Sequence, residues 1–121
     1  MKTSQDPRHI QRIKIMQLLF SWNFSKGKKG PKEIREIVTN LPEIDKVISE
    51  SAKDRPLAEI NRIDFAILRL AVFELIINKT APVKVIVDEA VELGKEFGSD
   101  SSSSFINGAL GQVIKLKKIA V

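Results

Sequence analysis

The chain has 121 residues, a length that fits one domain, and its 43% hydrophobic and 29% charged residues are the balance of a globular protein. It has no cysteine and one histidine, which excludes disulfide bonds, thiolate metal sites, a cysteine nucleophile and a site built from several histidines. The net charge of +5 suggests a polyanionic partner but does not establish one.

The N-terminus is polar and lacks the apolar stretch of a secretory signal. The most apolar stretch, residues 65–77, is interrupted by Arg69 and Glu74 and is shorter than the roughly 20 residues that a membrane-spanning helix needs. We therefore expect a cytoplasmic protein with no membrane partner.

Apolar residues recur at helical spacing through most of the chain. The first predicted helix covers residues 8–24, with Asp6 as its N-cap and Pro7 in its first position. A loop rich in glycine, proline and lysine follows. Three weaker elements come next, namely helices over 31–40 and 43–53 and a short helical turn over 56–60.

The central predicted helix covers residues 62–78, with Asn61 as its N-cap. It is apolar nearly all round, so neighbouring helices must bury it. Each large side chain buried is worth about 1.5–3 kcal/mol, so much of the stability should reside here. Arg69 either reaches the surface or pairs with a carboxylate of another helix, and we favour a structural ion pair.

Two further helices complete the predicted fold. One covers residues 82–97, and the last begins after a cap at Asp100 or Ser101. Gly108 and Gly111 should let another helix approach the last one closely. No segment alternates like a strand, so the sequence predicts an all-α bundle of five to seven helices.

Positive charge is concentrated at the N-terminus. Residues 1–33 hold eight basic and two acidic residues, whereas the other 88 residues have a net charge of −1. Arg8 and Arg12 share a helix face beside His9, and such a cluster can neutralise phosphates or stack on unpaired bases. The alternative is an ordinary helix start followed by a solvated lysine loop. What the loop at 26–29 does stays open.

No catalytic motif is visible. A group of acidic residues on the 82–97 helix resembles half of a carboxylate metal site, but the Glu-x-x-His pattern is missing and His9 is far away in sequence, so we interpret the group as a solvated face. The serines of 101–104 have no neighbouring base and are better explained as helix caps. The acidic group on the 82–97 helix consists of Asp88, Glu89, Glu92 and Glu96. We predict no enzyme activity, no cofactor and no metal.

Three segments of the second half, residues 63–75, 81–98 and 102–110, resemble in their order and spacing the NusB family of transcription antitermination factors. Residues 8–22 resemble the first helix of that family, including Gln17 and the Leu-Phe-Ser-Trp sequence at its end. The resemblance implies a single NusB-like RNA-binding domain of two packed helical subdomains over the whole chain, without catalytic activity.

The resemblance also implies a function. NusB-like proteins bind the single-stranded boxA element of nascent RNA together with NusE, a small-subunit ribosomal protein. They act on the RNA polymerase elongation complex with other Nus factors and promote read-through of terminators, notably in ribosomal RNA operons.

Site residues follow from the resemblance by position. Contacts to RNA are expected from Arg8, His9, Arg12, Phe20 and Lys84. The surface facing NusE is expected to include Asp64, Phe97, Asp100, Ser101 and Phe105. Other matching positions are expected to be structural, namely Arg69, Glu74, Glu89, Asn107 and Gly108.

Two other functions remain open. The chain could be a protein-interaction module without RNA contact, acting as a homodimer or an adaptor. It also resembles the N-terminal part of some ribosomal-RNA cytosine methyltransferases, a function that would need a catalytic half absent from this sequence. The oligomeric state, the preferred RNA sequence and the need for NusE in RNA binding are not decided by the sequence.

Overall fold

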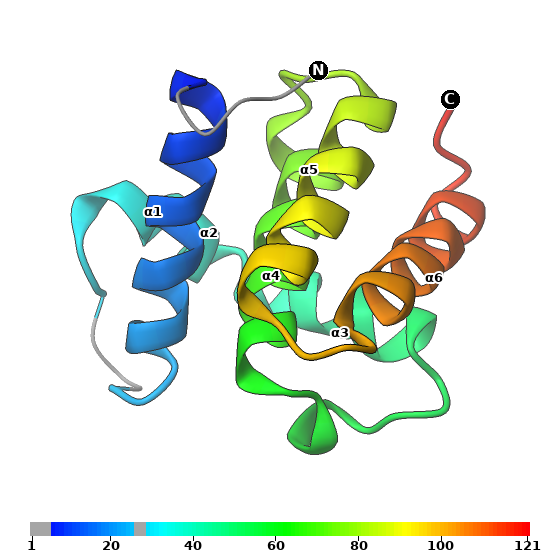
Figure 1. Cartoon of the computed structure of the whole chain (residues 1–121), viewed down its shortest axis with the longest axis horizontal. Helices are drawn as coiled ribbons and strands as arrows, with labels where there is room; N and C mark the ends of the chain where they lie inside the picture. Colours follow the sequence, from blue (N-terminus) through cyan, green and yellow to red (C-terminus); the bar gives the residue numbers. More distant parts are fainter. Residues whose placement is uncertain (1–5, 26–28) are drawn as a thin grey trace.

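The computed structural model describes residues 6–25 and 29–121, and all the regular structure within them is helical (Figure 1). The all-α class is therefore confirmed. Three of the lysines counted above, Lys2, Lys26 and Lys28, lie outside the described residues. The α-helices are α1 (Pro7–Trp22), α2 (Arg35–Thr39), α3 (Leu41–Ser51), α4 (Arg62–Phe73), α5 (Val83–Phe97) and α6 (Ser102–Leu116). Shorter elements are the 3-10 turns η1 (Lys32–Ile34) and η2 (Leu57–Glu59) and the π-helical turn η3 (Glu74–Asn78).

Helix α4 is the centre of the bundle. Every residue from Asp64 to Phe73 is buried, and α4 packs against α1, α3, α5 and α6, as its apolar circumference predicted. In Figure 1, α1 and α6 lie on opposite sides of the α4–α5 pair. The Asn61 side chain accepts hydrogen bonds from the backbone N–H groups of Ile63 (2.8 Å) and Asp64 (3.4 Å), which confirms the predicted cap.

The buried apolar side chains form one continuous core. It runs from Met16 and Leu19 of α1, through α4, to Ile106 and Leu110 of α6, so the N-terminal and C-terminal groups of helices share their interior. Among the described residues, no helix combines the length and the apolar character needed to cross a membrane.

A glycine brings α5 and α6 together, but it is not one of the two that we expected. A Cβ atom on Gly94 of α5 would lie 2.9 Å from Cδ1 of Ile106 and 3.4 Å from Cα of Ser103, so the two helices meet at this glycine. A Cβ atom on Gly108 or Gly111 would have no neighbour within 4 Å. The expectation that these two glycines admit another helix of the chain is therefore wrong.

Arg69 carries a buried charge in the middle of α4. Its Nε and Nη2 atoms donate to the carboxylate of Asp45 on α3 at 3.0 and 2.8 Å, and its Nη1 atom donates to Asn23 beyond the end of α1 at 3.2 Å. The guanidinium also lies 3.9 Å from the ring centroid of Phe65. The predicted ion pair is confirmed, and it links three helices.

The predicted helix over 62–78 changes geometry in its last turn. From Glu74 the backbone forms the wider π-helical turn η3, which ends where the N–H of Lys79 donates to the carbonyl oxygen of Glu74 at 2.9 Å. Lys79 itself has a left-handed backbone, with φ at 57°. Sequence periodicity does not distinguish this turn, which begins at Glu74, from α-helix.

Replacing Arg69 with methionine should lower the free energy of unfolding by about 2–3 kcal/mol, because Asp45, which keeps some solvent contact, loses its partner. Urea denaturation measures the change. The matched control is Arg62→Met in the first turn of α4, where one exposed hydrogen bond is lost and roughly 0.5 kcal/mol is expected. Equal losses in the two variants would contradict the structural assignment of Arg69.

Candidate functional site

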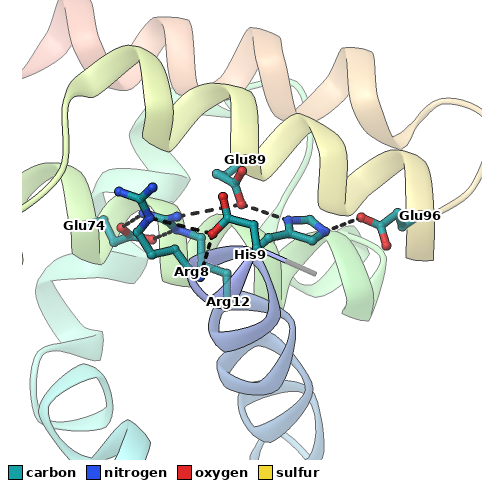
Figure 2. A network of polar contacts seen from close by, with 7 residues as sticks. Arg8, His9, Arg12, Glu74, Glu89 and Glu96 are labelled. Atoms are coloured by element: carbon teal, nitrogen blue, oxygen red, sulfur yellow. Dashed lines mark hydrogen bonds and ion pairs between the residues drawn. The ribbon is translucent and has the colours of Figure 1, made fainter. Parts of the chain in front are cut away.

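The first turn of α1 begins with a side-chain cap and packs against η3 and α5 (Figure 2). The Asp6 carboxylate accepts a hydrogen bond from the backbone N–H of Arg8 at 2.9 Å, and Pro7 occupies the first helical position. Both features were predicted. They fix the direction in which the next three basic side chains project.

His9 points into the protein and is 5% exposed. Its Nδ1 atom lies 2.9 Å from Oε1 of Glu89, and its Nε2 atom lies 2.6 Å from Oε1 of Glu96, both on α5 (Figure 2). A carboxylate only accepts hydrogen bonds, so both ring nitrogens must donate and the ring is an imidazolium. The hydrogen bond to Glu89, followed by that to Glu96, raises the pKa of His9 above its ordinary value, against the opposing effect of burial.

Arg12 lies one turn further along α1 and makes a bidentate ion pair with Glu74, the first residue of η3. Its Nε and Nη2 atoms donate to the two carboxylate oxygens of Glu74 at 2.9 and 2.7 Å, and its Nη1 atom lies 3.7 Å from Glu89. The side chains of Arg12 and Glu74 are only 13% and 12% exposed. Arg12 therefore has a structural task.

Arg8 is the basic side chain of this turn that reaches solvent. It is 87% exposed, and its nearest carboxylate is that of Asp6 at 3.7 Å. Arg8 and Arg12 line one groove of about 560 Å³, formed between α1, the segment of η1 and α2, and residues 78–85. The predicted shared face is thus present, with Arg8 exposed and Arg12 held in buried ion pairs.

The acidic residues of α5 are not all solvated, which corrects our interpretation of that face. Asp88 is exposed and Glu92 partly so, but Glu89 is 4% exposed and bonded to His9. Glu89 lies on the same helix face as the buried Ile86 and Leu93, a signal that was readable in the sequence. Within the described ranges, no group of three or more His, Asp or Glu side chains is arranged to hold a metal ion.

Phe20 stands at the far end of α1. It is half-buried and meets Phe24 edge to face, with ring centroids 5.2 Å apart and an angle of 74° between the planes. Phe24 is 67% exposed, an accessible aromatic that sequence reasoning did not single out. Twelve residues of helix place Phe20 about 18 Å along the axis from Arg8.

Lys84 is exposed in the first turn of α5. It does not line the groove of Arg8 but an adjacent one of about 650 Å³. Glu74, Ala81 and Pro82 line both grooves, so the two meet at the connection between η3 and α5.

Most residues expected at a partner surface lie around the start of α6. Phe97 is half-buried at the end of α5, and Asp100 and Ser101 are exposed. Phe105 is half-buried and lies under the guanidinium of Arg55, 4.0 Å from its ring centroid. Phe105 and Arg55 line a groove of about 320 Å³ between the end of α3 and α6. Arg55 was missed because its partner is fifty residues away in sequence.

Asp64 is not at the surface, which corrects the expectation from the resemblance. It is 2% exposed, and its Oδ1 atom has no hydrogen-bond partner among the described residues. A direct contact from Asp64 to a docked protein would require the start of α4 to move.

Replacing Arg12 with methionine should lower the free energy of unfolding by about 2–4 kcal/mol, because Glu74 and Glu89 lose a cation. The control is Arg8→Met one turn earlier on the same helix, which should leave the free energy of unfolding nearly unchanged because this side chain is exposed. If both variants lost stability equally, the division between a buried structural arginine and an exposed one would be wrong.

The stability that His9 provides should depend on pH. Its pKa is raised on folding, so its contribution is complete below the ordinary value of 6.5 and disappears as the pH rises through the higher folded value. Asp6, Arg12, Glu89 and Glu96 are the charged groups around the ring. Urea denaturation of the native protein and of His9→Gln from about pH 5.5 to about pH 9 should show their difference shrinking with rising pH. A difference that grows with pH would refute the imidazolium.

Comparison with known proteins gives a consistent result. A sequence model described as the NusB family matches residues 32–115. A protein of Colwellia psychrerythraea named transcription antitermination protein NusB is 35% identical over 130 residues, covering 91% of this chain and 94% of the relative. A solved structure of T. maritima NusB superposes with a TM-score of 0.78 at 30% identity, covering 95% of this chain and 93% of that one.

Two bacterial proteins with the same name are more similar over shorter regions. Those of Chloroflexus aggregans and Roseiflexus castenholzii are 48% and 42% identical, over 59% and 71% of this chain. The matched regions span only 49% and 65% of these two relatives. From the family match over most of its length and from the Colwellia relative, the chain belongs to the NusB family of transcription antitermination factors.

Proposed function

We propose that the chain binds boxA-type single-stranded RNA together with the ribosomal protein NusE and thereby promotes read-through by RNA polymerase, notably in ribosomal RNA operons. Family membership supports antitermination as the process. The observation that carries RNA binding is the exposed guanidinium of Arg8 at the rim of a groove that Arg12 also lines. A guanidinium so placed can pair with a phosphate or stack on an unpaired base.

The three basic residues near the start of α1 then have different roles. His9 and Arg12 fix the start of the helix to α5 and η3 through buried ion pairs, and Arg8 projects from the first turn to meet RNA. His9 and Arg12 act in RNA binding as positioning residues. Phe20 and its exposed neighbour Phe24 offer a stacking surface about 18 Å along α1, so one strand would follow the length of the helix to touch both ends.

The groove beside Phe105 is the proposed site for NusE. It contains an aromatic ring with an arginine stacked on it, and both residue types are enriched in protein interfaces. Gly108 lines this groove, and packing within the chain does not explain it, because a Cβ atom there would touch nothing. Glycine weakens a helix interior, so its presence fits a partner that comes close to α6.

A protein-interaction module without RNA contact is the second candidate. The specific observation in its favour is that His9 and Arg12 are buried and paired with carboxylates, which leaves Arg8 as the exposed one of these three basic residues. Tight self-association that covers Arg8, with no RNA binding in the presence or absence of NusE, would favour this function.

Replacing Arg8 with alanine should weaken binding to a boxA-like RNA and reduce the slope of log affinity against log salt by about 0.7, the value for one phosphate contact on a single strand. Fluorescence anisotropy with and without NusE measures both quantities, with a scrambled RNA for comparison. Lys46→Ala, which removes one exposed charge from α3, is the matched control. Unchanged affinity and slope for Arg8→Ala would contradict the proposed contact.

A further inference from the structure

Four lysines line the groove next to that of Arg8. They come from three places in the sequence, namely Lys79 after η3, Lys84 in the first turn of α5, and Lys117 and Lys118 after α6. All four are exposed, and none forms an ion pair with another described residue. The groove measures about 650 Å³ and also has an apolar part.

The groove has one acidic residue among its described lining side chains, and its charge is already balanced. That residue is Glu74, whose two carboxylate oxygens accept hydrogen bonds from Arg12. Four exposed lysines around one hollow raise the local concentration of anions.

Helix dipoles account for only part of this set of lysines. Lys79, Lys117 and Lys118 follow the ends of η3 and α6, where the partial negative charge favours a cation. Lys84 stands at the start of α5, where the dipole disfavours a cation. The dipoles therefore do not explain why Lys84 lies in the same groove.

Backbone conformation also marks this groove. Lys79 and Lys118 have φ values of 57° and 52°, and they are the non-glycine residues with positive φ in the described part of the chain. Glycine or asparagine adopts this conformation at lower cost. Both positions instead carry a lysine that lines the same groove.

We infer that this lysine groove, in particular the Lys117–Lys118 segment, binds the phosphate backbone of single-stranded RNA and extends the contact made at Arg8. The inference rests on the proposed function. The two grooves share Glu74, Ala81 and Pro82, so a strand leaving Arg8 can cross the connection before α5 and enter the lysine groove. Recognition here is of phosphate charge and is independent of base sequence.

The test replaces Lys117 and Lys118 together with glutamine, which removes the charge and keeps a side chain of similar backbone preference. The matched control is Lys46→Gln with Lys95→Gln, two exposed lysines on α3 and α5 that line neither groove. Binding is measured against salt for a boxA-like RNA of about 12 nucleotides and for one extended on both sides to about 30 nucleotides. Urea denaturation confirms that each variant is folded.

For the longer RNA, the slope of log affinity against log salt should be smaller by about 1.4 in the Lys117→Gln/Lys118→Gln variant, which is the value for two phosphate contacts. The control pair should keep the native slope. Charge reversal of both residues to glutamate should weaken binding further. An extended RNA with a scrambled flanking sequence should show the same change in affinity and salt slope, because the lysines contact phosphates and not bases.

The Lys117→Gln/Lys118→Gln variant could keep the native salt slope and affinity while Arg8→Ala still weakens RNA binding. That result would overturn the inference about the lysine groove and leave the proposed function standing. Failure of the native protein to bind either RNA, with or without NusE, would overturn both. Loss of NusE binding with unchanged RNA binding would assign the groove to a protein and also overturn the inference.

Discussion

The placement of α1 depends on a buried network of ions. His9 and Arg12 project from one face of the helix and meet Glu89 and Glu96 of α5 and Glu74 of η3. Charges are removed from water at high cost, and this is tolerable only where each ion has a partner in good geometry. The two cations therefore help to fix the orientation of α1 on the bundle. Arg8 lies about 100° around the helix from His9 and one turn closer to the N-terminus than Arg12, and there its side chain is exposed.

Local signals predicted most of the fold. The caps at Asp6 and Asn61 and the apolar circumference of α4 are encoded by neighbours in sequence, so they could be read directly. The sequence allowed us to expect a carboxylate as the partner of Arg69, but it did not show which one, since Asp45 is 24 residues away. A buried cation demands an anion, and sequence alone does not say which one.

The candidate site was harder to predict for the same reason. Its central contact joins His9 to Glu89 across 80 residues, and a histidine near a helix start gives no sign of its partner. The resemblance implied RNA contacts from Arg8, His9 and Arg12, whereas tertiary packing gives these three residues different surroundings. The surface position of Asp64 was expected from the resemblance, whereas tertiary packing buries this residue in the first turn of α4.

The π-helical turn η3 determines how the end of α4 responds to a change in chain length. It holds about one more residue per turn than an α-helix, and it carries the carboxylate that Arg12 requires. Deleting one residue of η3 after Glu74 would let the backbone return to α-helical geometry with the following segment in nearly the same orientation, because the π-helical turn uses one residue more than an α-helical turn for the same rotation. The same deletion inside α4 would rotate all the following residues by about 100° relative to the core. The loss of one residue should therefore be tolerated within η3 and not within α4.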